Sequence, residues 1–128
     1  GKLKVVMAPR PGHFDSALAE AGPSPVLTAH GIVMLYNGKN AATGGDPSRP
    51  VGEYAAGRVV LDPRDPTKVI ERAEAPFFVP QLPWEKSGQY EAGTAFIEGL
   101  VRFGGQWLLY YGAADSVCGV VAISDEVL

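Results

Sequence analysis

Two stretches, GIVMLYNGKN (31–40) and GQWLLYYGAAD (105–115), decide the fold that we predict for this chain. Each begins with glycine, continues as an apolar run that contains aromatic or β-branched residues, and ends in small and polar residues. GRVVLD (57–62) follows the first stretch and GVVAIS (119–124) follows the second, so a pair of strands occurs twice. Glycine and proline are spread between these runs as turn residues. The pattern predicts an all-β chain of short antiparallel strands.

The repeated unit has the size of one propeller blade, since each half offers about three or four antiparallel strands. We therefore predict a single partial β-propeller domain over 1–128, with blade-like units at about 1–75 and 76–128. Two blades do not close a ring, because a closed propeller needs at least about four. Two unrelated hairpin pairs in a β-sandwich remain the alternative.

Local patterns add further expectations along the chain. LKVVMA (3–8) is a short apolar run before Pro9 and predicts a buried strand, whereas residues 15–21 have some helical character. Asn37-Gly38 is a turn dipeptide and is expected to end the strand that starts at Gly31. Further strands are predicted at 54–61, 68–73, 94–103, 106–111 and 118–124.

Composition excludes several classes of function. The net charge is −3, so the chain lacks the excess of Lys and Arg that a nucleic-acid surface needs. No run approaches the length of a membrane span, and no signal-peptide pattern opens the chain, which leaves the cytoplasm and the periplasm both open. The single cysteine, Cys118, and the isolated His13 and His30 predict no metal site, and no motif predicts a cofactor.

Three longer segments carry a family resemblance: AGPSPVLTAHGIVMLYNG (21–38), GRVVLDPRDPTKVIERAEAPFFVP (57–80) and WEKSGQYEAGTAFIEGLVRFGGQWLLYYGAADS (84–116). They contain an LD-x-x-DP-x-K-V-x-x-R pattern and a YYG-x-AD pattern, which are specific in combination. The chain resembles glycoside hydrolase family 130, whose members are mannoside phosphorylases and mannosidases on a five-bladed β-propeller. The match corresponds to the later part of that propeller.

This resemblance implies a carbohydrate-active parent protein with a mannoside or oligosaccharide as substrate. In the family the proton-donating aspartate lies in an early blade, and no residue of this chain matches it. The chain alone is therefore expected to be incomplete for catalysis. The missing blades, or self-association with other chains, would have to complete the fold.

The resemblance also bears on the kind of cleavage. The family's phosphorylases have a histidine in a YHG motif and a lysine well upstream, and here these positions hold Asn37 and fall near Leu18. A phosphate dianion without cationic partners is poorly held, so the sequence favours an inverting hydrolase over a phosphorylase.

A hydrolase needs a carboxylate that positions the attacking water. Glu20, before Gly22-Pro23, and Glu85, in the 83–85 segment, are the candidate catalytic residues. Asp115 matches the aspartate that lines the family's sugar site, and it is the first choice for binding sugar hydroxyls. The remaining candidate substrate-binding residues are Tyr36, Asn37, Lys39, Asn40, Glu98, Tyr111 and Arg10.

Three functions stay open at this point. The leading one is hydrolysis of β-linked mannosides by the parent protein. The second is a mannoside phosphorylase that holds phosphate through other residues. The third is a non-catalytic, sugar-binding propeller fragment.

Overall fold

The computed structural model describes residues 3–88 and 90–128, and within these ranges regular structure consists of β-strands and two short 3-10 helices. The predicted all-β class is therefore confirmed. The two 3-10 helices are η1 (Pro83–Lys86) and η2 (Asp125–Val127). The strands are β1 (Leu18–Ala21), β2 (Val26–Thr28), β3 (Gly31–Lys39), β4 (Tyr54–Leu61), β5 (Val69–Arg72), β6 (Phe96–Phe103), β7 (Gln106–Ala113) and β8 (Val117–Ile123).

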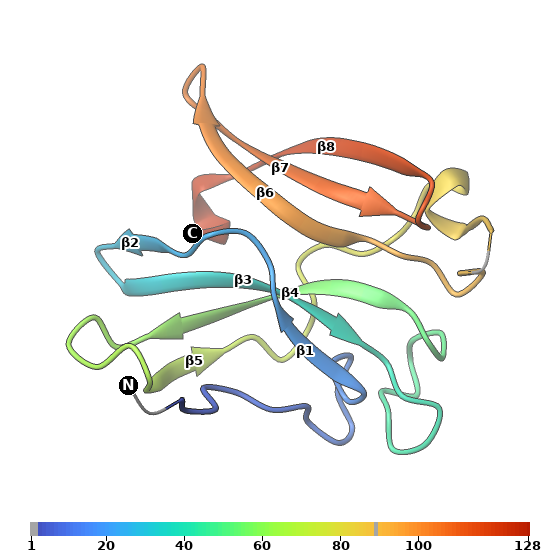
Figure 1. Ribbon diagram of the computed structural model, residues 1–128, viewed down its shortest axis with the longest axis horizontal. Coiled ribbons are helices and arrows are strands. Elements are labelled where there is room, and N and C mark those ends of the chain that lie inside the picture. Colours follow the sequence, from blue (N-terminus) through green and yellow to red (C-terminus); the bar gives the residue numbers. More distant parts are fainter. Residues whose placement is uncertain (1–2, 89) are drawn as a thin grey trace.

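The first sheet has the antiparallel order β1-β3-β4-β5, and β2 shares the inner edge of β3 with β1 (Figure 1). β1 pairs with residues 36–39 of β3 and β2 with residues 31–33, so the inner edge is one strand interrupted at 22–25. Gly22 lies at the break, where its N–H donates to the carbonyl of Leu35 at 3.2 Å. A side chain at this position would meet the same carbonyl at 2.9 Å, so only glycine allows the close approach.

The second sheet has the order β6-β7-β8, and its strand β6 packs against β3 and β4 of the first sheet (Figure 1). The β6–β7 hairpin turns at Gly104-Gly105, where both residues have positive φ (58° and 81°), a conformation that glycine adopts without strain. A bulge between Ile97 and Gly99 shifts the register of β6 against β7. Within the described residues β8 pairs with β7 alone.

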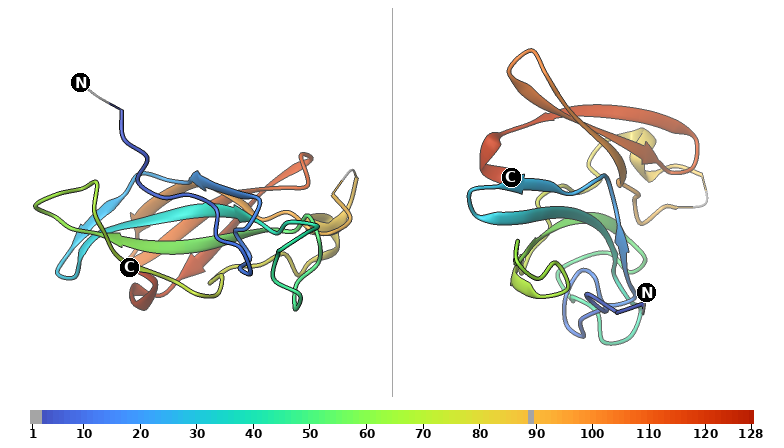
Figure 2. Two further views of the ribbon diagram at one scale, coloured as in Figure 1. Left: turned by 90° about the horizontal axis from the view of Figure 1, so that it is seen from below. Right: turned by 60° about the vertical axis from the view of Figure 1, so that its left-hand side comes forward.

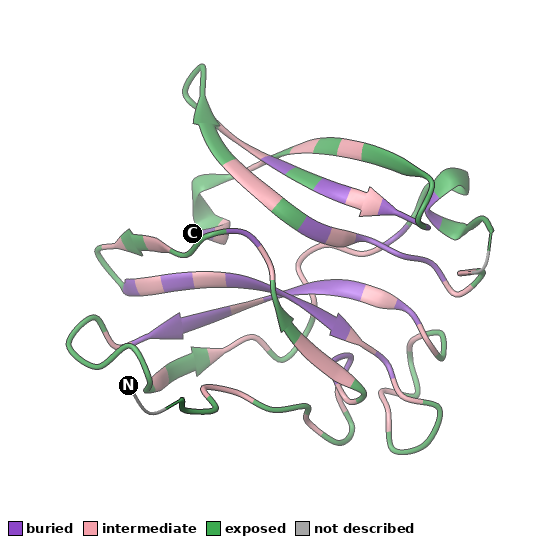
Figure 3. Ribbon diagram, viewed as in Figure 1, coloured by how far each residue is buried: buried purple, intermediate pink, exposed green. Residues whose placement is uncertain are grey.

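One apolar core joins the two sheets. It combines Val33 and Leu35 of β3 with Ile97 of β6 and Leu109 of β7, each at most 2% exposed. β3 and β4 are the most deeply buried strands, whereas β8 alternates exposed and half-buried residues (Figure 3). Because burial of such side chains is the main favourable term in folding, the core holds the sheets together as one body.

The repeat seen in the sequence is also a repeat of packing. In the first sheet Tyr36 lies opposite Gly57, and in the second Tyr111 lies opposite Gly119. Each tyrosine ring covers its glycine so closely that a Cβ there would lie 2.4 Å or 2.5 Å from a ring carbon. Both aligned segments therefore pack a tyrosine on a glycine of the following strand. With Gly31 and Gly38 aligned to Gly105 and Gly112, the second tyrosine lies one residue further along than the first.

Three local expectations are wrong. Residues 3–8 form no strand: Leu3 and Val5 are exposed, and the segment runs in extended form alongside the first sheet (Figure 2), where Arg72 donates to the carbonyl of Ala8. The expected helical segment at 15–21 instead ends in strand β1, since pairing with β3 overrides its local propensity.

The third error concerns Asn37-Gly38. These residues do not turn, because β3 continues through them to Lys39 and pairs on both sides. Asn37 is completely buried, and its side chain has partners in the second sheet.

The predicted blade boundary near 75 falls between the two sheets, whose strands span 18–72 and 96–123. The segment between them runs over the core, and Phe77 and Phe78 pack against it. The organisation as a single partial domain stays a prediction.

Candidate functional site

A polar pocket of about 200 Å³ opens where β3 ends and where β4 and β6 begin. Two of the predicted substrate-binding residues, Glu98 and Asp115, line it together, although they lie on different elements of the second sheet. The other lining residues are Tyr54, Tyr90, Thr94 and Phe96. The pocket thus combines two carboxylates with aromatic rings, which is the combination that binds both the hydroxyls and the C–H faces of a sugar.

The aromatic wall of the pocket is a small cluster centred on Tyr54. Its ring meets Tyr90 edge to face at 6.0 Å between centroids and Phe96 at 5.8 Å. The ammonium group of Lys39, another predicted binding residue, lies 4.8 Å from the centroid of the Tyr54 ring. This cation–π contact brings a positive charge next to the pocket.

Thr94 contributes a buried polar atom to the pocket. Its backbone N–H donates to the carbonyl of Glu85 at 2.7 Å. Its hydroxyl oxygen is the one buried side-chain N or O atom without a hydrogen-bond partner among the described residues. Buried polar groups are nearly always satisfied, so this hydroxyl is suited to a ligand hydroxyl.

Asp115 stands on a strained turn after β7. Ala114 and Asp115 have φ values of 48° and 53°, a left-handed conformation that costs non-glycine residues roughly 1–3 kcal/mol. The N–H of Ser116 closes the turn onto the carbonyl of Ala113 at 3.1 Å. The hydrogen bond between Tyr90 and Asp115 raises the pKa of Tyr90, and the nearby negative charge acts in the same direction. The strained turn and this tyrosine together hold the carboxylate at the pocket.

Asn37 lies behind the pocket and joins the two sheets. Its carboxamide oxygen accepts from the N–H of Ile97 at 2.7 Å, and its amide nitrogen donates to the carbonyl of the same residue at 3.0 Å. Because Ile97 is the residue between Phe96 and Glu98, this contact fixes the pocket wall formed by β6. Asn37 itself is fully buried.

The two candidate catalytic glutamates differ in environment. Glu20 is exposed on β1 and pairs in register with Asn37. Glu85 is 2% exposed, accepting from the backbone N–H groups of Gln81 and Leu82 at 2.6 Å and 2.7 Å. Its other oxygen accepts from the hydroxyl of Tyr111 at 2.5 Å. Glu85 and Tyr111 thus hold the 81–85 segment against β7.

Burial raises the pKa of Tyr111 to about 12, and its hydrogen bond to Glu85 contributes in the same direction. The hydroxyl therefore remains a donor throughout the physiological range.

Tyr36 and Arg10 meet in a second buried cluster, around Asp15. Asp15 is completely buried and accepts from Tyr36 at 2.7 Å, from Arg10 at 3.0 Å and from Arg72 at 2.6 Å. Burial raises the pKa of Tyr36 to about 12, against the opposing effect of the hydrogen bond from Arg72. In this chain both predicted binding residues are engaged within the first sheet.

Asn40 organises the loop that follows β3. Its amide nitrogen donates to the carbonyls of Asp46, Arg49 and Pro50, and its oxygen accepts from the N–H of Asp46 at 2.8 Å. The side chain is 2% exposed. Its contacts hold the 41–53 loop next to Tyr54.

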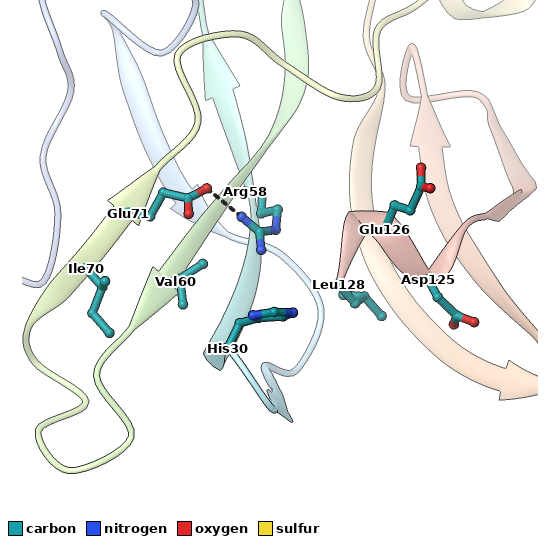
Figure 4. Close-up of a pocket in the computed structure, with 8 residues that line it drawn as sticks. All are labelled: His30, Arg58, Val60, Ile70, Glu71, Asp125, Glu126 and Leu128. Atoms are coloured by element: carbon teal, nitrogen blue, oxygen red, sulfur yellow. Dashed lines mark hydrogen bonds and ion pairs between the residues drawn. The ribbon is translucent and has the colours of Figure 1, made fainter.

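A second pocket, of about 360 Å³, lies at the opposite end of β3 (Figure 4). His30 and the 3-10 helix η2 border it, and the Arg58 guanidinium is paired with Glu71 at 2.8 Å and donates to the carbonyl of Val127. The ion pair is partly exposed, so it adds little stability. None of the predicted site residues lines this pocket.

Sequence reasoning missed Tyr54, Tyr90 and Thr94. Tyr54 and Thr94 lie just after loops, at or next to the start of a strand, and a parallel bridge joins them. Their position near strand starts was a usable signal, because the strands that follow them, β4 and β6, come from neighbouring sheets that pack together. Within the described ranges no cluster of three His, Cys, Asp or Glu residues could hold a metal, and no helix there could span a membrane.

Comparison with solved structures places the sheets in a larger fold. A glycosyl hydrolase from Bacteroides ovatus aligns with a TM-score of 0.92 at 50% identity, covering 98% of this chain and 35% of that one. A second structure aligns with a TM-score of 0.93 at 49% identity, covering 98% and 35%. It is described as showing that a family of mannoside phosphorylases contains glycoside hydrolases that target β-1,2-mannosidic linkages in Candida mannan.

The fold and these matches define a carbohydrate-active protein in which the two sheets are antiparallel blades of a five-bladed β-propeller. The family model described as beta-1,4-mannooligosaccharide phosphorylase matches residues 1–128. The chain therefore belongs to glycoside hydrolase family 130.

Among characterised relatives, a 1,2-beta-oligomannan phosphorylase from Thermoanaerobacter sp. is 34% identical over 120 residues. The match covers 94% of this chain and 37% of the relative. The chain thus spans about a third of the length of the relatives it matches.

Proposed function

We propose that the full-length protein hydrolyses β-linked mannosides with inversion, and that the pocket at Asp115 binds the sugar. The observation that carries the choice of hydrolysis is Asn37. It stands where the family's phosphorylases have histidine, and both ends of its carboxamide are bonded to the backbone of Ile97. It offers no positive charge to phosphate, and its side chain is completely buried.

The degree of similarity supports the same choice. The chain is 49% identical to the structure described in connection with glycoside hydrolases that target β-1,2-mannosidic linkages, against 34% for the oligomannan phosphorylase. β-1,2-Mannobiose is therefore the substrate to test first.

Within this proposal, Glu20 is a better candidate than Glu85 for positioning the attacking water. Glu20 is exposed on the innermost strand of the first sheet, next to the clamp formed by Asn37. Glu85 has no accessible oxygen, since both are occupied by donors within the fold. The acid that protonates the leaving group would come from a part of the propeller outside these residues.

The test uses the full-length protein with β-1,2-mannobiose, measured with and without added phosphate. We expect mannose as the product in both conditions. Asp115→Asn and Glu20→Gln should each lower kcat/KM by at least about 100-fold, the usual scale for a lost acid–base or electrostatic contact. Glu91→Gln, at an exposed carboxylate outside the pocket, is the matched control and should leave the rate unchanged. Near-native rates in both Asp115→Asn and Glu20→Gln would overturn the assignment.

A phosphorylase is the second candidate, and Lys39 is the observation that favours it. Its ammonium group lies over Tyr54 at the pocket and could pair with an anion there. If activity requires phosphate, yields mannose 1-phosphate and is lost in Lys39→Gln, phosphorolysis replaces hydrolysis as the function.

A further inference from the structure

Thr94 carries a buried hydroxyl at the pocket that also contains Asp115. The residue lines this pocket and is only 4% exposed, so most of its surface is packed against the fold. Its hydroxyl has no hydrogen-bond partner among the described residues, whereas buried polar groups in native proteins are nearly always paired. Because the residue borders the pocket, a ligand bound there is the nearest source of such a partner.

The backbone around Thr94 is fixed on three sides. Tyr54 donates its N–H to the carbonyl of Gly93 at 3.0 Å, and its own carbonyl accepts from the N–H of Ala95 at 3.1 Å. The N–H of Thr94 donates to the carbonyl of Glu85 at 2.7 Å. A β-branched side chain such as that of threonine has few rotamers on a fixed backbone. The hydroxyl is therefore held in place before any ligand arrives.

The other polar groups of the pocket show what Thr94 adds. Glu98 and Asp115 line the pocket, and an ionised carboxylate can only accept hydrogen bonds. The hydroxyl of Tyr90 is already hydrogen-bonded to Asp115. A threonine hydroxyl can donate as well as accept. The carboxylates can thus accept from sugar hydroxyls, while Thr94 supplies a neutral donor for a sugar oxygen.

We propose that Thr94 determines sugar specificity in this pocket by donating a hydrogen bond to one hydroxyl oxygen of the bound sugar. This inference rests on the proposed function, in which the pocket at Asp115 binds a mannoside. A site with a buried group placed for one substrate hydroxyl rejects the analogue that lacks this hydroxyl, because the protein group is then left unpaired. Thr94 therefore selects for one hydroxyl position on the sugar ring.

The test measures the binding of methyl β-mannoside and each of its monodeoxy analogues to the full-length protein by calorimetry. Thr94→Val keeps the shape of the side chain and removes the hydroxyl, so it should raise the Kd of methyl β-mannoside about 10-fold, the scale of one lost hydrogen bond. For one monodeoxy analogue the wild type and Thr94→Val should bind equally, because the oxygen that Thr94 contacts is absent. Thr94→Ser keeps the hydroxyl and should retain the discrimination of the wild type.

The stability of the variants separates a role in binding from a role in the fold. Thr94→Val should leave the urea midpoint unchanged or raise it, since the hydroxyl has no partner among the described residues. Thr28→Val is the matched control at the opposite end of β3, where the Thr28 hydroxyl donates to the carbonyl of Gly31 and accepts from the N–H of His30, both at 3.1 Å. It should lower the midpoint and leave sugar binding unchanged.

Three outcomes would overturn the inference. If Thr94→Val binds every sugar as the wild type does, or weakens the parent sugar and all analogues by the same factor, Thr94 reads no hydroxyl and the proposed function stands. A lower urea midpoint with unchanged binding would assign the hydroxyl to a structural water. If the wild type binds no mannoside at all, the proposed function fails together with this inference.

Discussion

The two sheets solve one packing problem with different chemistry. In each, a tyrosine ring covers a glycine of the next strand and donates its hydroxyl to a buried carboxylate from the segment that precedes the inner strand. In the first sheet two guanidinium groups balance the charge of Asp15. In the second, two backbone amides solvate Glu85. The comparison teaches that the tyrosine–glycine contact is the repeated element, while the charge balance depends on which strands surround it.

Removal of the two buried carboxylates should give the largest difference in stability loss between the two sheets. Asp15→Ala removes the buried carboxylate that two guanidinium groups and a hydroxyl share, which should cost about 3–5 kcal/mol of the free energy of unfolding. Glu85→Ala leaves only neutral donors behind and should cost about 1–3 kcal/mol. Urea unfolding followed by circular dichroism measures both, and a larger loss for Glu85→Ala would break the comparison.

Removal of the tyrosine hydroxyls should reverse this order, with the larger stability loss in the second sheet. Tyr111→Phe leaves one oxygen of Glu85 without its donor, so we expect a loss of about 2 kcal/mol. Tyr36→Phe leaves Asp15 with both arginines, and the loss should be about 1 kcal/mol. The same unfolding measurement applies, and equal losses would mean that the arginines do not compensate.

Alanine substitution of the two glycines that the tyrosine rings cover tests how far each strand can shift to admit an added methyl group. Gly57→Ala, in a strand paired on both sides, should cost about 2–3 kcal/mol by overpacking, and Gly119→Ala somewhat less, because β8 is an edge strand that can shift. Gly112→Ala is the control, since its nearest neighbour lies 3.9 Å from the added carbon. A larger cost at Gly119 than at Gly57 would contradict this account.

The smallest expected effect concerns His13, which lies beside the first sheet and has no counterpart in the described part of the second. Its hydrogen bond to the carbonyl of Pro11 raises its pKa, and so does the one to Glu74 at 2.7 Å. The charged form is favoured in the folded state, so its stabilisation is fully present below the unfolded pKa of about 6.5 and is lost as pH rises through the folded value. For this exposed pair we expect well under about 1 kcal/mol. NMR titration of His13 checks the shift, and Glu74→Gln should reduce it.

Local pattern predicted much of the sheet structure, because apolar runs bounded by turn residues mark β4 and the β6–β7 hairpin without distant contacts. The prediction from local pattern failed where contacts between residues far apart in the sequence determine the backbone conformation. The 3–8 run has the composition of a strand but lies outside both sheets, and Asn37-Gly38 resembles a turn but is held straight by strands on both sides.

The residues of the candidate site also fall into those that the local sequence predicted and those that it did not. Glu98 and Asp115 were found by motif and do meet at one pocket. The aromatic wall and the Thr94 hydroxyl were not found, because they come together only when β4 and β6 lie side by side. Likewise, nothing in the local sequence marks Asp15 as the centre of a charged cluster, whose most distant partner, Arg72, lies 57 positions away.

The carboxamide clamp between Asn37 and Ile97 has a consequence for the energetics of recognition. It fixes the spacing between the two sheets at the wall of the pocket before any ligand arrives. Under the proposed function, a sugar entering there would meet a preorganised surface and spend little of its binding free energy on reorganising the protein. Such a pocket would favour lock-and-key selection over induced fit.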